Sequence, residues 1–265
     1  MIMTITLLVV LYLAICVLVF MHEREHVLVL LKHGFRPHFV AIGAPIPFLW
    51  NFFWEVRHER LLEGIPVRFY PLLIGGAYKL DITQLRSLLK CKFALQAEVH
   101  SAGIWVNLLF PLFGFGIWGL FVHEWFRASL CLAGAALLWI GKRLVSVYVF
   151  PVLTLLVGIY ALPKMFALIL SSHPSVQGTL VHGVSTSVHN GLAWQQGLLF
   201  VLLASLLFAL MNLLPLLPFD GGRMVHAFLK TRWAKAARLY AYATIPVCAA
   251  IVAYSLFLEA YALLR

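Results

Sequence analysis

The chain has 265 residues, of which 63% are hydrophobic and only 11% are charged, and its mean hydropathy is +0.94. Soluble globular domains carry about 25% charged residues, so this composition excludes an ordinary soluble domain and predicts a polytopic membrane protein. The net charge of +10 does not indicate nucleic-acid binding, because the basic residues lie in loops between apolar stretches and form no tract with interleaved aromatic residues.

The first predicted element is a membrane helix over residues 2–31. Residues 1–20 lack the basic start and the small-residue cleavage site of a signal peptide. The apolar pattern also continues beyond a charged cluster at residues 22–26 as far as Leu31. We therefore expect an uncleaved helix that carries the charged cluster inside the membrane.

After a mixed segment at residues 40–92, five more apolar stretches approach or exceed the ~20 residues that a membrane span needs. They cover residues 98–121, 126–141, 144–163, 192–217 and 239–262. With the first helix they predict an all-α polytopic membrane protein of about six transmembrane helices, in one domain over residues 1–265. The region 126–163 is expected to cross the membrane twice, with an inner turn at Lys142 and Arg143. The stretch from 192 ends in an Asp-Gly segment at residue 222.

Basic residues predict which loops face the cytoplasm. Nine Lys or Arg lie between residues 32 and 98, and five more lie between residues 221 and 238. The positive-inside rule places both loops on the cytoplasmic side. Six spans then put both ends of the chain outside.

Residues 22–26 read His-Glu-Arg-Glu-His. Residues four apart on a helix share one face about 6 Å apart along the axis, so His22 and His26 can hold one metal ion while Glu23 lies beside a bound water. Zinc suits such a site, because it takes imidazole and carboxylate ligands and lowers the pKa of bound water to about 7. Glu23 would accept the proton of that water and pass it to the leaving amine.

The alternative interpretation of this cluster is a charged helix end at the membrane surface with interfacial histidines. The apolar residues that continue to Leu31 argue against it, since they place the cluster within the membrane. There each charged residue would cost about 2.5 to 3.5 kcal/mol near the bilayer centre, which is usually tolerated only for function.

A third ligand should come from a distant segment on the same side of the membrane, and the only aspartates are Asp81 and Asp220. Asp220 is the stronger candidate, because it directly follows a long apolar span that is broken by two prolines and precedes two glycines. Non-helical backbone at membrane depth is tolerated where it is buried in protein or lines a cavity. The alternative is that Asp220 is an ordinary helix cap.

Four segments, taken in order, resemble the site-2 protease family of intramembrane zinc metalloproteases, in a minimal form without a PDZ or CBS domain. The cluster at 22–26 matches the zinc helix of the family, and residues 212–222 (Asn-Leu-Leu-Pro-Leu-Leu-Pro-Phe-Asp-Gly-Gly) resemble its second signature. Residues 70–78 resemble the family's re-entrant β-hairpin on the cytoplasmic side, and residues 101–107 resemble the start of its next helix.

The resemblance implies a zinc metalloendopeptidase that cleaves transmembrane segments of membrane-bound substrates, in regulated proteolysis or in removal of signal-peptide remnants. It implies one zinc ion with Glu23 as the catalytic residue. The implied ligands are His22, His26 and Asp220, and the residues expected to bind substrate are Asn107, Asn212, Gly75 and Gly76. Both asparagines have an alternative role as hydrogen-bonding residues between packed helices.

The expected partners are a transmembrane protein substrate, the lipid bilayer and a regulatory membrane protein, with no nucleic acid. The expected location is the plasma membrane of a bacterium, with the active site toward the cytoplasm. Two other functions remain open: a non-catalytic membrane scaffold of the same fold, and a metal- or haem-binding membrane transporter. Haem would usually need paired axial histidines on facing helices, whereas a histidine pair four residues apart with an intervening glutamate suits hydrolytic zinc.

Overall fold

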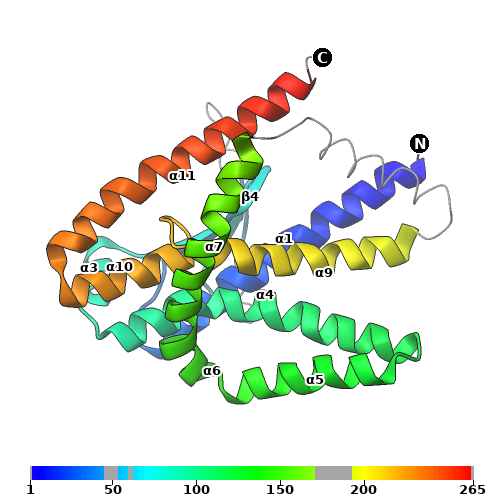
Figure 1. The fold of residues 1–265 in the computed structure, drawn as a ribbon, viewed down its shortest axis with the longest axis horizontal. Coiled ribbons are helices and arrows are strands. Elements are labelled where there is room, and N and C mark those ends of the chain that lie inside the picture. The colour runs from blue at the N-terminus through cyan, green and yellow to red at the C-terminus, as the bar shows by residue number, and fades with distance from the viewer. Residues whose placement is uncertain (1, 45–52, 59–61, 171–192, 264–265) are drawn as a thin grey trace.

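The computed structural model is mostly helical, with one small sheet (Figure 1). It describes residues 2–44, 53–58, 62–170 and 193–263. Four helices contact one another around the centre of the molecule: α1 (Ile2–Lys32), α4 (Phe93–Phe121), α9 (Ala193–Asn212) and α10 (Asp220–Arg232). The remaining helices pack around this group.

The sheet lies between α1 and α4 in the sequence and has four strands in the order β2-β3-β1-β4. Its strands are β1 (Phe39–Ala44), β2 (Trp54–Val56), β3 (Val67–Phe69) and β4 (Leu72–Lys79). β1 runs parallel to β3 and antiparallel to β4. The expected β-hairpin at residues 70–78 is therefore replaced by a mixed sheet, in which that segment is β4 and its partner is the distant strand β1.

Burial of apolar side chains explains how the sheet is attached to α1. Val40 and Ile42 of β1 and Val67 of β3 form one core with Val19 and Val27 of α1. All five side chains are almost fully buried. At roughly 25 cal/mol per Å² of buried apolar surface, each such side chain contributes about 1.5 to 3 kcal/mol. This core fixes β1, and through it β4, against the helix that carries the His-Glu-Arg-Glu-His cluster.

β4 is an edge strand, since within the described residues it pairs with β1 alone. Its pairing shifts register between Ile42 and Ala44, opposite the two glycines of β4. Gly75 has φ of +142°, which side-chain-bearing residues rarely adopt. The strand therefore presents a free edge beside α1, which it contacts.

Asp81, the weaker of the two candidate aspartate ligands, directly precedes the short helix α3 (Ile82–Leu88). Its carboxylate accepts hydrogen bonds from the backbone N–H groups of Thr83 and Gln84, at 2.8 and 2.9 Å. Asp81 is thus the N-cap of α3. The hydroxyl of Thr83 also donates to this carboxylate, and this hydrogen bond, together with those from the backbone, holds the pKa of the Asp81 carboxyl below the usual value.

After α4 the chain forms a helix that packs against α4 and then a longer helical segment that contains a π-helical turn. α4 forms an antiparallel pair with α5 (Trp125–Ile140), and small residues bring the two close together, because a Cβ on Gly119 would lie 3.1 Å from Ala128 Cβ (Figure 1). After Gly141 the chain continues as α6 (Lys142–Leu144), a π-helical turn η1 (Val145–Val149) and α7 (Phe150–Leu170). The indole N–H of Trp105 donates to Ser146 Oγ at 2.7 Å, which ties this π-helical turn to α4.

The last part of the chain returns to the centre. α9 runs beside α1 and ends at Asn212, and a turn leads into α10, whose first residue is Asp220 (Figure 1). The final helix, α11 (Ala234–Leu263), packs on α10. Gly221 and Gly222 lie directly on the turn, because a Cβ on either would overlap the backbone of residues 213–217. This tight contact fixes where α10 starts.

Two helical segments in the described ranges are long and apolar enough to cross a membrane, Phe93–Phe121 and Lys142–Tyr160. Trp125–Ile140 and Gly197–Asn212 are shorter apolar helices. Many large apolar side chains point outward, among them Leu13 and Val17 of α1, Leu137 and Ile140 of α5, Ile159 of α7 and Leu207 of α9. Such continuous apolar surface is typical of helices surrounded by lipid. The arrangement of six spans stays a prediction.

Candidate metal centre

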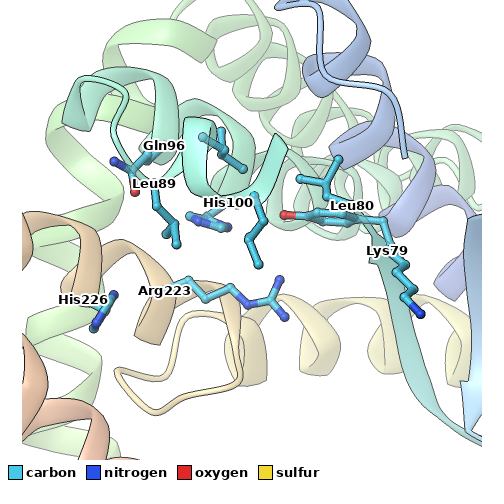
Figure 2. A pocket seen from close by; sticks show the side chains of 10 residues that line it. Lys79, Leu80, Leu89, Gln96, His100, Arg223 and His226 are labelled. Carbon is cyan, nitrogen blue, oxygen red and sulfur yellow. The ribbon is translucent and has the colours of Figure 1, made fainter. Parts of the chain in front are cut away.

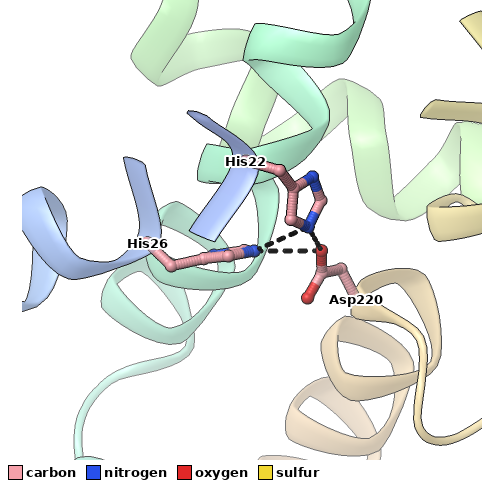
Figure 3. A group of neighbouring side chains, drawn as sticks. All are labelled: His22, His26 and Asp220. Atoms are coloured by element: carbon pink, nitrogen blue, oxygen red, sulfur yellow. Dashed lines mark hydrogen bonds and ion pairs between the residues drawn. The ribbon is translucent and has the colours of Figure 1, made fainter. Parts of the chain in front are cut away.

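Side chains from two segments that are far apart in the sequence meet at the centre of the molecule. They are His22 and His26 from α1 and Asp220 from the start of α10 (Figure 3). Their exposed fractions are 7%, 1% and 4%. The i, i+4 spacing places both imidazoles on one face of α1, and the turn before α10 brings the carboxylate to that face. These are the three ligands expected from the sequence.

The ligand atoms form a nearly equilateral triangle. His22 Nε2 and His26 Nε2 are 3.1 Å apart, and each lies 3.1 Å from Asp220 Oδ2. Four-coordinate zinc with bonds of about 2.0 to 2.1 Å separates its ligand atoms by about 3.3 Å. The triangle therefore fits one face of a zinc tetrahedron, and the donor set of two imidazoles and one carboxylate is one that catalytic zinc uses. Such a face leaves the fourth position open.

A hydrogen bond from the other ring nitrogen orients His26. Its Nδ1 lies 2.6 Å from the backbone carbonyl oxygen of Val99 on α4, so Nδ1–H donates to this oxygen. The proton then resides on Nδ1, and Nε2 keeps its lone pair for a metal. The same contact joins α1 to α4 at the level of the site.

Asn107 of α4 lies at Nδ1 of His22, as the Val99 carbonyl lies at Nδ1 of His26. Its amide group lies against the ring, with 2.9 Å between Asn107 Nδ2 and His22 Nδ1, and Oδ1 is buried with no hydrogen-bond partner in the described part of the chain. A half-turn of the carboxamide gives Oδ1 a partner, because it then accepts the Nδ1–H of His22. In that orientation His22 Nε2 is free to bind a metal, as in His26. Asn107, expected to bind substrate, thus touches a predicted ligand.

Two glycines allow other elements to approach the centre closely. The ring of His22 rests on Gly103 of α4, where any Cβ would overlap it. A Cβ on Gly76 of β4 would lie 2.5 Å from Glu23 Cγ and 2.9 Å from Glu23 Oε1. The family resemblance singled out Gly76 as a residue that binds substrate, which stays a prediction, whereas its contact with Glu23 and the role of Gly103 were missed. A glycine in the interior of a long helix was the available indication, since glycine there costs about 1 kcal/mol relative to alanine.

Glu23 lies beside the three predicted ligands and is 5% exposed. Within the described part of the chain its carboxylate has no hydrogen-bond partner, in contrast to Glu25, which pairs with Arg24 and Lys142. A buried carboxylate without a partner beside a metal triangle is available to accept a proton from water. The arrangement is one that can activate water for hydrolysis.

The other residues expected to bind substrate lie near the centre to different degrees. Gly75 precedes Gly76 in β4, at the free edge of the sheet. Asn212 is the last residue of α9 and is half-buried, and its side chain makes no hydrogen bond with the described residues. Contact with substrate stays a prediction for all of them.

Comparison with protein families relates this chain to a known family. The model of peptidase family M50 matches residues 10–253, a range that contains both predicted histidine ligands, Glu23 and Asp220. Searches of curated proteins and of solved structures found no significant match.

Proposed function

Because this chain belongs to peptidase family M50, the site-2 protease family of membrane metalloproteases, we propose that it cleaves transmembrane segments of other membrane proteins with one zinc ion. One observation supports this most directly: a triangle of His22, His26 and Asp220 ligand atoms with edges of 3.1 Å. The family match alone would also suit a member that has lost its metal, but the intact triangle argues against such a scaffold.

The residues at the centre have distinct parts in the proposed reaction. His22, His26 and Asp220 would hold the zinc ion, which would supply Lewis-acid chemistry and make water acidic enough to be deprotonated near neutral pH. Glu23 takes that proton and later delivers it to the leaving amine, because its carboxylate is buried close by and free of other hydrogen bonds. Asn107 and Val99 hold the two imidazoles so that their Nε2 atoms face the metal.

The free edge of β4 is the proposed place for the substrate backbone. A transmembrane substrate is helical, with its amides bonded internally, and a protease needs an extended chain. Pairing with an edge strand provides replacement hydrogen bonds for a chain that has been opened. Gly76 brings this edge next to Glu23, and neither Gly75 nor Gly76 has a side chain to obstruct the peptide. Asn212 is proposed to hydrogen-bond the opened backbone or the developing oxyanion.

The location and partners belong to the same proposal. The active site faces the cytoplasm of a bacterial plasma membrane, because Arg223, Lys230 and Arg232 lie on α10, directly after Asp220. The substrates are membrane-bound regulators or remnant signal peptides, and a regulatory membrane protein selects among them.

The test is to measure bound zinc and cleavage of a model transmembrane substrate for the wild-type protein and for Glu23→Gln. We expect Glu23→Gln to keep its zinc and to lose at least about 100-fold in cleavage rate, the range for loss of a general base. Glu25→Gln is the matched control, since it makes the same change two residues away, where the carboxylate pairs with Arg24 and Lys142. Haem absorbance, absence of zinc, or cleavage that is indifferent to Glu23 would refute the proposal.

A further inference from the structure

A cavity of about 380 Å³ lies next to the metal centre, between β4, α3, α4 and α10 (Figure 2). Some residues that line this cavity lie close in the sequence to residues that form or orient the metal centre. Arg223 is one helical turn after Asp220 on α10, and His100 follows Val99, whose carbonyl accepts from His26. The ring of Tyr78, a further wall residue, lies 5.7 Å from the ring of His26.

The polar lining of this cavity is basic. Its polar side chains are Tyr78, Lys79, Gln96, His100, Arg223 and His226, and no Asp or Glu is among the described residues that line it. The half-buried Arg223 interacts with the Tyr78 hydroxyl and forms no ion pair within the described residues. Asp220 and Glu23 act on it electrostatically, but a metal bound to Asp220 would use the charge of that carboxylate. Glu23 is then the remaining carboxylate that acts on Arg223, and it forms no ion pair with the guanidinium within the described residues.

A second observation, independent of charge, indicates that the cavity takes a ligand. His100 is 8% exposed, and its Nδ1 is buried with no hydrogen-bond partner among the described residues. Leaving a buried polar atom unpaired destabilises the folded protein, so most such atoms in native proteins have a partner. Figure 2 shows His100 from α4 and Arg223 from α10 directed toward the same space. A ligand with oxygen acceptors would satisfy both.

The position of β4 indicates what this ligand is. The edge that is proposed to pair with the substrate passes Glu23 at Gly76 and reaches the cavity at Tyr78 and Lys79, two and three residues later. Asp220 and Arg223 are three residues apart on α10, which is about 4.5 Å along the helix axis. An extended peptide advances about 3.3 Å per residue. A group that reaches Arg223 therefore comes from within about two residues of the bond that is cut.

We propose that this cavity binds a carboxylate of the substrate, the side chain of an Asp or Glu within about two residues of the scissile bond. The planar guanidinium of Arg223 matches a carboxylate with two parallel hydrogen bonds, and the imidazole of His100, which lines the same cavity, donates a third. The inference rests on the proposed protease function and adds a preference for an acidic residue to it. Arg223 and His100 are specificity residues here and take no part in the activation of water.

The test compares matched substrates that differ only by Glu or Gln at each of the two positions on either side of the cut. For the wild-type protein in vesicles we expect a kcat/KM about tenfold or more higher with Glu at one of these positions, as for a charge-assisted hydrogen bond. Arg223→Gln should bring the ratio of Glu to Gln substrates close to one, Arg223→Lys should retain part of it, and His100→Gln should lower it. Zinc content and thermal unfolding show whether each variant is folded.

Arg232→Gln is the matched control, because it removes the same charge from α10 at an exposed position that does not line the cavity. It should keep the wild-type ratio. Equal cleavage of Glu and Gln substrates by the wild-type protein would overturn the inference and leave the protease function standing, whereas cleavage of neither would overturn both. A rate loss in Arg223→Gln that is equal for both substrates and occurs only in vesicles with phosphatidylglycerol would assign the cavity to a lipid phosphate instead.

Discussion

The ring of His22 occupies the space that Gly103 leaves on α4, since a Cβ on Gly103 would lie within 2.5 Å of His22 Nδ1. This contact sets how closely α1 and α4 approach at the level of the metal centre. His22 cannot turn away freely, because its ring also meets Asn107 one helical turn further along α4. The position of a predicted zinc ligand therefore depends on a residue that has no side chain.

Gly103→Ala is expected to displace the imidazole of His22 and to lower zinc affinity by at least about tenfold, as for loss of an orienting contact. Alanine is the better helix former by about 1 kcal/mol, so a loss would reflect the contact and not helix propensity. Zinc affinity is measured by competition with a chelator. Gly134→Ala on α5 is the control, because a Cβ there meets nothing within 4 Å. Equal affinities in the two variants would contradict the prediction.

Asn107→Ala should weaken zinc binding about 10- to 100-fold, because His22 loses the partner that holds its tautomer. Asn107→Asp keeps an acceptor oxygen for the His22 Nδ1–H and should bind zinc more tightly than Asn107→Ala. Zinc content and cleavage are measured together. Zinc binding at the wild-type level with lost cleavage would show that Asn107 contacts substrate and does not position the ligand.

Gly76→Ala is expected to reduce kcat by at least about tenfold with little change in zinc content. The new methyl group would lie 2.5 Å from Glu23 Cγ and 3.0 Å from the Ala41 carbonyl oxygen, so the carboxylate must move. Ala77→Ser changes the next residue of β4, which points to the other face of the strand, and serves as the control. Cleavage by Gly76→Ala at the wild-type rate would show that Glu23 tolerates the shift.

Removal of zinc with a chelator should lower the unfolding temperature of the wild-type protein. The ion holds the start of α10 to α1 through Asp220, and a ligand that binds only the folded state stabilises it. Asp220→Ala should unfold at nearly the same temperature with and without chelator. The comparison is made by thermal unfolding in detergent, and a chelator effect of equal size in both proteins would count against a metal at this site.

The cap of α3 should give this helix a dependence on pH. Hydrogen bonds from Thr83 and Gln84 hold the pKa of Asp81 below its usual value, so its carboxylate stabilises the folded helix above about pH 4. This stabilisation is lost as the pH falls through the lowered pKa. Hydrogen exchange of the α3 amides should be faster in Asp81→Ala than in wild type at pH 6, and the difference should narrow in acid. A difference that is constant with pH would exclude a contribution from the charge.

Several features of the chain could be predicted from local sequence. The His-Glu-Arg-Glu-His spacing places two imidazoles on one helical face in any regular helix, and α1 carries them there. The break of the apolar span by prolines and glycines singled out Asp220, and Asp81 proved to be a helix cap. The family resemblance, carried by four short motifs, is confirmed by the match to peptidase family M50.

The strand pairing of the sheet could not be predicted from local sequence. A hairpin was expected at residues 70–78, because this segment resembles the re-entrant β-hairpin of the family. The structure pairs β4 with β1 and places β3 on the other side of β1. Partners so far apart are chosen by burial against α1, which the periodicity of one strand does not encode.

The sequence by itself predicted a membrane protein, two histidines on one helical face with Glu23 beside them, and Asp220 as the third ligand, because hydropathy, helical spacing and breaks in apolar runs are local properties. Only the tertiary structure decided that Asn107 lies on His22, that Gly103 and Gly76 leave room for His22 and Glu23, and that Arg223 and His100 face one cavity. Each of these contacts joins segments far apart in the chain. They depend on how α1, α4, β4 and α10 pack, and packing is a property of the whole fold.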